Sequence, residues 1–181
     1  MIEVIGIDPS LTATGVCLPD GTCTTIKTGG AHRGDQRLHD LRRAMRYYLR
    51  AWPARLAVIE VPGQFRSGDA ALAAGMVQGV IREILVEFQL PFGKIHLTKV
   101  KQFATGKGDA DKATMVAAAN RHRDADPLTD DNQADAWWLR QIGLWHLGEK
   151  TLDPSQDEWL NPHLLRDEID RNPKGAKWPG R

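Results

Sequence analysis

Two acidic residues lie inside the most apolar, strand-like segments of the chain. Asp8 ends the run MIEVIGID, and Glu60 lies within RLAVIEVPG. A carboxylate without a partner is costly to bury, so each side chain must hold a proton or pair with a cation. Taken alone, Asp8 is explained as a cap on the turn that begins at Pro9. Two acids at the ends of two strands instead favour a shared site at one edge of a sheet.

A third acidic group lies in the segment TDDNQADAWWL. In a helix, Asp131 and Asp135 share one face, and Asn132 lies three residues before Asp135. Like charges at this spacing repel each other unless a cation lies between them. Oxygen ligands favour Mg²⁺ or Mn²⁺ over Zn²⁺. Two such ions about 4 Å apart activate water and stabilise the leaving oxygen in phosphodiester cleavage.

Three lysines surround a glycine-containing stretch in VKQFATGKGDADKATM. Lys101, Lys107 and Lys112 lie around ATGKG, whose glycines allow a backbone to approach a phosphate closely. The stretch is not a nucleotide-binding P-loop, because Lys107 is followed by Gly108 rather than by Ser or Thr. A lysine here can neutralise phosphate charge in a transition state. For Lys107, a solvated loop is the alternative.

Charge is distributed unevenly along a chain of 181 residues whose formal net charge is only +1. Residues 33–55 and 94–123 each carry seven basic residues against two Asp, whereas residues 124–135 carry five Asp and no basic residue. Basic blocks beside an acidic pocket suit an enzyme that binds a polyanion and holds cations against it. Solvated helix faces explain the same charges without a function.

Composition narrows the class of protein further. The length fits one domain with a sizeable core. No apolar run approaches a membrane span, and Glu3 and Asp8 interrupt the N-terminal run, so we expect a cytoplasmic protein with no signal peptide and no membrane contact. Cys17 and Cys23 flank a turn at residues 19–21. We expect them to be reduced thiols, because two cysteines give no metal framework and cytosolic disulfides are uncommon.

The hydrophobic pattern predicts a mixed α/β domain. Strands are expected over residues 2–7, 13–18, 22–28, 55–62 and 93–97, and helices over 36–51, 69–89, 109–121 and 129–147. The first three strands are expected to form an antiparallel meander. The strand that ends at Asp8 is apolar on both faces, which places it in the centre of the sheet.

Four motifs in order resemble one family. GIDPSLTATG, AVIEVP, VKQFATGKGDADKATM and DNQADAWWL occur in the order and approximate spacing of the RuvC-type Holliday junction resolvases, within the ribonuclease H-like superfamily. The resemblance covers residues 1–147. It implies a five-stranded mixed sheet, an antiparallel meander followed by parallel strands, flanked by helices. It also implies a homodimer that cuts a four-way DNA junction by paired symmetric nicks with Mg²⁺, for which Mn²⁺ is expected to substitute.

The resemblance gives the acidic residues their roles. Asp8 matches the first-strand carboxylate that bridges metals, Glu60 the acid of the fourth strand, and Asp135 the last helix acid. The family usually has Asp or His three residues before the last Asp, where this chain has Asn132. Either Asn132, through its amide oxygen, or the neighbouring Asp131 completes the ligand set.

The same resemblance gives roles to basic and aromatic residues. Lys101 and Lys112 match basic residues near the scissile phosphate, so Lys112 joins the acids in the catalytic set and both lysines, with Lys107, are expected to bind DNA. Phe65 and Arg66 lie in the loop after Glu60, and in the family an aromatic residue of this loop touches the junction centre.

One predicted helix contains a pair of closely spaced glycines. In Gly75-Met-Val-Gln-Gly79 the two glycines are four residues apart, which gives a flat stripe for close helix approach. The family uses this helix in its dimer interface. Packing against the sheet of the same chain is the alternative.

We expect residues 1–148 to form the RuvC-like nuclease domain and residues 149–181 a partly flexible C-terminal extension with a short docking helix within 159–169. Two other functions stay open. One is a different ribonuclease H-like nuclease that acts on forks, flaps or RNA–DNA hybrids. The other is a non-catalytic junction-binding protein with a decayed ligand set, which Asn132 would favour and the three acids argue against.

Overall fold

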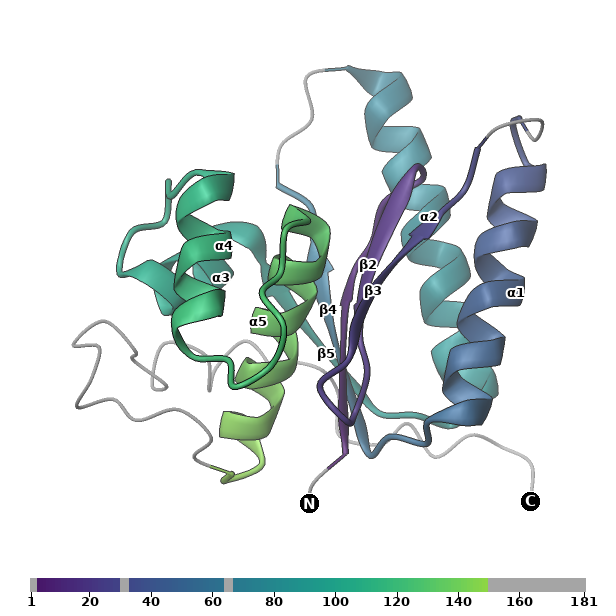
Figure 1. The fold of residues 1–181 in the computed structure, drawn as a ribbon. Coiled ribbons are helices and arrows are strands. Elements are labelled where there is room, and N and C mark those ends of the chain that lie inside the picture. The colour runs from purple at the N-terminus through teal and green to yellow at the C-terminus, as the bar shows by residue number, and fades with distance from the viewer. Residues whose placement is uncertain (1–2, 30–32, 64–66, 150–181) are drawn as a thin grey trace.

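The computed structural model describes residues 3–29, 33–63 and 67–149, and its centre is a five-stranded sheet between two groups of helices (Figure 1). The strands are β1 (Val4–Asp8), β2 (Ala13–Cys17), β3 (Cys23–Lys27), β4 (Leu56–Val61) and β5 (Phe92–His96), in the order β3-β2-β1-β4-β5. The first three pair antiparallel, and β1, β4 and β5 pair parallel. The predicted meander and the central position of β1 are confirmed.

Helices cover both faces of the sheet. On one face lie α1 (Gln36–Ala51) and α2 (Gly68–Glu87), and on the other lie α3 (Leu97–Thr105), α4 (Lys112–Arg121) and α5 (Asp131–His146), as Figure 1 shows. Side chains along β1 alternate between the two faces of the sheet, and the core is therefore divided into two clusters. Val4 packs in the cluster on the α5 side, while Ile5 and Ile7 pack in the cluster on the α1 side. In the described part of the chain, no helix is long and apolar enough to cross a membrane.

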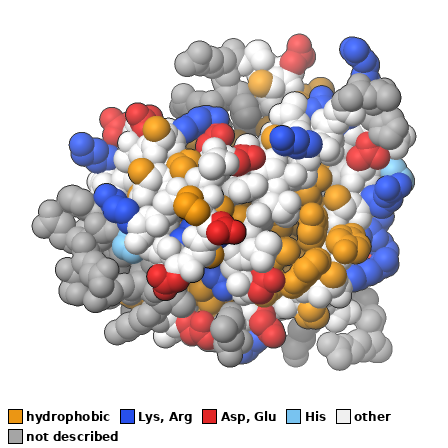
Figure 2. Space-filling model, viewed as in Figure 1, with side chains coloured by type: hydrophobic (Ala, Val, Ile, Leu, Met, Phe, Trp, Pro, Cys, Tyr) orange, Lys and Arg blue, Asp and Glu red, His pale blue; other side chains and the backbone are white. Residues whose placement is uncertain are grey.

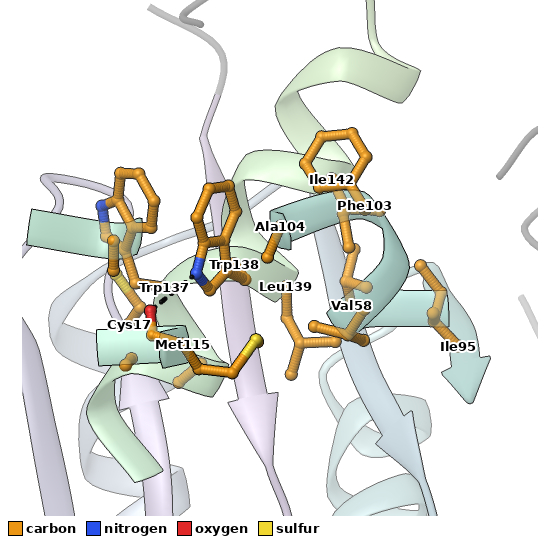
Figure 3. Packing of buried hydrophobic residues seen from close by; sticks show 14 of the residues in the cluster. Cys17, Val58, Ile95, Phe103, Ala104, Met115, Trp137, Trp138, Leu139 and Ile142 are labelled. Atoms are coloured by element: carbon orange, nitrogen blue, oxygen red, sulfur yellow. Dashed lines mark hydrogen bonds between the residues drawn. The ribbon is translucent and has the colours of Figure 1, made fainter. Parts of the chain in front are cut away.

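The core between the sheet and α3–α5 is built around a buried tryptophan. Trp138 packs edge to face against Phe103 and Trp137, and its indole N–H donates a hydrogen bond of 3.3 Å to the carbonyl oxygen of Met115 (Figure 3). This arrangement buries a large aromatic side chain while satisfying its polar atom. It fixes α3, α4 and α5 to one another on the face of the sheet where Asp8 and Glu60 also lie.

Helix α5 lies unusually close to the sheet. A Cβ atom at Gly6 would lie 2.0 Å from the carbonyl oxygen of Ala136, and one at Gly15 would lie 2.0 Å from that of Asn132. No other residue type leaves room for this approach, so glycine is required at both positions. The first turns of α5 are thereby held against the middle of β1 and of β2.

One helix was missed by the sequence pattern, and another begins later than predicted. The sequence pattern assigned residues 98–108 to no helix or strand, yet Leu97–Thr105 forms α3 directly after β5, with Val100, Phe103 and Ala104 buried. Gly106, at φ 75°, ends that helix, and a Cβ at Gly108 would meet Thr98 at 2.7 Å. These glycines therefore have structural roles in this fold. Helix α4 begins at Lys112 rather than 109 because Asp111 caps it by accepting from the Thr114 N–H.

Part of the basic block on α1 is used within the fold. Arg42 and Arg46 form ion pairs with Glu87 of α2, and Arg42 also pairs with Glu83. Other members line a groove of about 900 Å³ between β3 and α1, which includes the exposed Tyr47. Figure 2 shows apolar side chains gathered on this side and bordered by Lys and Arg. The ion pairs of Arg42 and Arg46 agree with the interpretation of this block as a helix face. Other arginines, which line the groove, stay exposed to solvent.

Candidate active site

Three acids converge at one end of the sheet because of strand register. In the parallel pair of β1 and β4, Ile7 lies opposite Ile59, so Asp8 and Glu60 each follow by one residue. Both point to the α5 face, because side chains alternate and Ile7 and Ile59 belong to the opposite core. Asp135 comes from α5, whose first turns are held against Gly6 and Gly15.

Burial and mutual repulsion perturb all three carboxyl groups. Burial raises the pKa of Asp8 from its ordinary 3.8 to about 7, with further contributions from the charges of Asp135 and Asp131. Burial, followed by the charges of Asp8 and Asp135, raises the pKa of Glu60 from 4.5 to about 9. The pKa of Asp135 rises to about 6, through burial and then Asp131. Folding therefore brings together acids that resist being charged at the same time.

Two oxygens of this cluster lack partners. Oε2 of Glu60 and Oδ1 of Asp135 are buried and accept no hydrogen bond from the residues that the structure describes. Among residues 3–29, 33–63 and 67–149, no three acidic, His or Cys side chains already stand in an arrangement that encloses an ion. Unsatisfied, hard oxygen donors in a common place nevertheless fit a divalent cation of the Mg²⁺ type.

The two candidates for the fourth ligand have different surroundings. Asp131 is half-buried and forms an ion pair with the Nζ atom of Lys112, and its charge raises the pKa of Asp8 and Asp135, in each case after burial. Asn132 instead donates from its side-chain amide and its backbone N–H to Oδ1 of Asp130, each at 2.8 Å. The charge of Asp131 thus acts on the acid cluster, while the amide of Asn132 is engaged by the helix cap.

The predicted basic residues fall into separate places. Lys101 on α3 counteracts the raised pKa of Glu60 and of Asp135, and Lys112 does the same for Asp8 and Asp135, burial being the larger effect in each case. Lys107 lies in the exposed loop between α3 and α4. Phe65 and Arg66 lie outside the described residues, as does the extension beyond residue 149. Lys101 and Lys112 therefore lie with the acid cluster.

Several supporting residues gave no signal in the sequence. Gln78 of α2 donates to the carbonyl oxygen of Glu60 at 2.6 Å, and Thr25 of β3 donates to Oδ2 of Asp130, the N-cap of α5, at 2.7 Å. Buried Thr14 accepts from the Ser10 N–H and so closes the loop that follows Asp8. These contacts join residues distant in the chain, apart from the Ser10–Thr14 pair. Of these contacts, only the one made by Thr14 could have been suspected from the sequence, because Thr14 lies in the TATG of the first motif.

A mixed sheet of this order, with acids at the ends of β1 and β4 and in the first turns of α5, defines a nuclease of the ribonuclease H-like class. A family model described as crossover junction endodeoxyribonuclease RuvC matches residues 4–136. The chain belongs to that family, whose members are metal-dependent nucleases that hydrolyse phosphodiester bonds.

Individual relatives agree with this assignment. The RuvC of Synechococcus sp. (strain WH7803) is 29% identical over an alignment of 144 residues, and the match covers 75% of this chain and 93% of that protein. Thermus thermophilus RuvC, solved in complex with Holliday junction substrate, matches with a TM-score of 0.69 and 19% identity over 81% of this chain and 93% of that chain. The yeast mitochondrial Holliday junction resolvase matches with a TM-score of 0.52 and 13% identity over 82% of each chain. The structural matches establish the shared fold.

The raised pKa values predict how stability depends on pH. In the metal-free folded protein, Asp8, Glu60 and Asp135 keep protons that they lose above about pH 4 in the unfolded chain. These protonated acids therefore contribute fully to the stability of the fold below about pH 4, and this contribution is lost as the pH rises through about 6 to about 9. The free energy of unfolding is expected to fall as the pH rises from 5 to 9. We expect this fall to be smaller in Glu60→Gln than in wild type by more than about 1 kcal/mol. Urea denaturation in the presence of a chelator measures this. Asp109→Asn, on an exposed loop, is the matched control, and identical losses in Glu60→Gln and wild type would refute the expectation.

Proposed function

We propose that this protein resolves four-way DNA junctions by paired, symmetric, metal-dependent nicks, one phosphodiester bond being hydrolysed in each of two strands. The observation that carries this proposal is the acid cluster, in which buried oxygens of Glu60 and Asp135 lack partners while Lys101 and Lys112 lie alongside. Membership of the RuvC family and the shared fold with Thermus thermophilus RuvC support a junction as substrate.

The proposed metal ligands are Asp8, Glu60, Asp135 and Asp131. Their oxygens suit Mg²⁺, with Mn²⁺ as a substitute, because both are hard cations that prefer carboxylates. When bound, the metal supplies charge neutralisation at the phosphate and a lowered pKa of water. Asn132, through its amide oxygen, is the alternative fourth ligand. The negative charge of Asp131, which already acts on Asp8 and Asp135, favours Asp131.

The basic residues have a separate task in this proposal. Lys101 and Lys112 place positive charge beside the acids, where the scissile phosphate must lie, and so offset the negative charge that builds up as the bond breaks. Lys112 also holds Asp131 through their ion pair. Lys107, Phe65 and Arg66 are proposed contacts to the DNA outside this centre. Residues 1–148 are proposed as the nuclease domain, with 149–181 as an extension.

We also propose that α2 forms the interface of a homodimer, which paired nicks require. Over residues 72–79 its outer face is apolar, where a helix exposed to water is normally polar. Leu72 is 64% exposed and Met76 36% exposed. A Cβ atom at Gly75 or Gly79 would have no neighbour within 4 Å, so a second helix could approach the backbone closely along this stripe.

The acid cluster is tested by Asp8→Asn. We expect this variant to lose nicking of a four-way junction by more than about a hundredfold, because it removes a negatively charged ligand without changing side-chain size, and to bind the junction within about threefold of wild type. Labelled junctions, forks, flaps and RNA–DNA hybrids are assayed with Mg²⁺, with Asp109→Asn as the control. Nicking by Asp8→Asn at the wild-type rate would rule out the proposed centre. Preference of the wild type for another substrate would overturn junction resolution.

The fourth ligand is tested by comparing Asp131→Asn with Asn132→Ala. We expect Asp131→Asn to weaken Mn²⁺ binding by about tenfold or more, because it removes a charged oxygen ligand, and Asn132→Ala to change it by less than about threefold. Calorimetric titration of Mn²⁺ gives both affinities without reference to cleavage. The reverse order of effects would assign the ligand to Asn132.

The dimer interface is tested by Leu72→Glu. We expect wild type to be a dimer and Leu72→Glu to be a monomer by light scattering after size exclusion, because a buried, unpaired carboxylate opposes association. Tyr47→Glu is the control, since Tyr47 is 62% exposed on α1. A monomeric wild type, or a variant that still dimerises as tightly, would contradict the assignment of α2.

A further inference from the structure

Two cysteines that have no role in the nuclease centre lie opposite each other across a β-hairpin. Cys17 at the end of β2 pairs with Cys23 at the start of β3, and the two sulfur atoms are 2.7 Å apart. Both cysteines are free in this structure. Cys17 lies beside Gly6 of β1, whereas Asp8 lies beside Gly15, so the pair is separate from the acid cluster.

The backbone geometry at this pair suits a disulfide. Leu18 donates to the carbonyl oxygen of Thr22 at 2.8 Å, which makes Leu18 and Thr22 a hydrogen-bonded pair. Pairs alternate along antiparallel strands, so Cys17 and Cys23 form a non-hydrogen-bonded pair, in which Cα atoms are about 4.5 Å apart. Disulfides span Cα distances of about 4.4–6.8 Å. The sulfur atoms can therefore join with little movement of the strands.

Two arginines place positive charge around these sulfurs. Nη1 of Arg123 lies 3.7 Å from the sulfur of Cys23 and donates to the carbonyl oxygen of Gly21 at 3.3 Å. Nη2 of Arg140 donates to the carbonyl oxygen of Pro19 at 2.6 Å. The Nε atom of each arginine is buried without a partner, and neither forms an ion pair with a carboxylate of the described residues. An anion at Cys23 would lie next to these cations.

The two thiols differ in accessibility and acidity. Cys23 is partly exposed and lines a cleft of about 600 Å³ at the hairpin, while Cys17 is fully buried. The hydrogen bond between the two sulfurs, with the nearby Arg123, lowers the pKa of the Cys23 thiol against the opposing effect of burial, whereas burial raises the pKa of Cys17. A thiolate that is accessible and beside a cation reacts first in thiol–disulfide exchange, and a neighbouring thiol then resolves the adduct.

We propose that Cys23 and Cys17 form a redox-active dithiol, in which the Cys23 thiolate attacks a low-molecular-weight disulfide and Cys17 then closes the intramolecular bond. The Cys23 thiolate forms a bond to one sulfur of the small disulfide, whose S–S bond breaks and releases one thiolate. That thiolate takes up the proton of Cys17, and the Cys17 sulfur then attacks Cys23 and releases the second thiolate, which gains the proton lost from Cys23. Two protein thiols are oxidised, and one disulfide is reduced to two small thiols.

The test uses the full-length protein, oxidised glutathione at pH 7.5 and intact-mass spectrometry. We expect wild type to lose two thiols and two hydrogens, to hold no stable glutathione adduct, and to recover both thiols with dithiothreitol. Cys17→Ala should instead retain one glutathione on Cys23, and Cys23→Ala should react at least about tenfold more slowly. These are the only two cysteines of the chain, so the assignment of each mass is unambiguous.

The role of the guanidinium is tested in the Cys17→Ala background. Arg123→Met is expected to slow glutathione addition by about threefold or more, because it removes the cation beside the thiolate, while Arg121→Met, at the exposed end of α4, leaves the rate unchanged. Equal rates in these two variants would overturn the assignment of Arg123.

The wild-type measurement does not depend on any variant folding. A stable glutathione adduct, unreacted thiols or a disulfide-linked dimer in wild type would each overturn the proposed dithiol.

Discussion

Repulsion among buried carboxylates is the interaction on which the site depends. Asp8, Glu60 and Asp135 are placed together in partly dehydrated surroundings, and the charge of Asp131 adds to the repulsion. Burial is the largest cause of each raised pKa and repulsion adds to it, while Lys101 and Lys112 offset the two effects only in part. Such a cluster is held together either by protons or by a cation. Oε2 of Glu60 and Oδ1 of Asp135, which accept no hydrogen bond from the described residues, are the oxygens that a cation would contact in the second case.

The close contact between α5 and the sheet makes this arrangement unavoidable. Gly6 and Gly15 allow the backbone of α5 to rest on β1 and β2, which brings Asp135 to the strand ends that carry Asp8 and Glu60. The far side of α5 is fixed by Trp138, packed against α3 and α4 (Figure 3). The acids cannot separate without disturbing this core. The packing of α5 therefore holds these acidic groups close together, although their proximity is energetically unfavourable.

Much of this arrangement could be predicted from the sequence because it follows local patterns. An apolar run with an acid at its end indicates a central strand that opens onto a site, as β1 does, and the apolar stripe of α1 gives its observed range of Gln36–Ala51. Helix α3 was missed because glycines and lysines drew attention to a loop, while its buried stripe of Val100, Phe103 and Ala104 is short. The contacts of Gln78 with Glu60 and of Thr25 with Asp130 exist only in the folded chain.

The central claim is that the acid cluster exchanges protons for a divalent cation, and calorimetry tests it directly. Mn²⁺ is titrated into metal-free protein at pH 7 in two buffers of different ionisation enthalpy, which gives the number of protons released on binding. With the pKa of Glu60 at about 9 and that of Asp8 at about 7, release of about one proton or more is expected. Binding of Mn²⁺ without proton release, or no binding at all, would contradict the account.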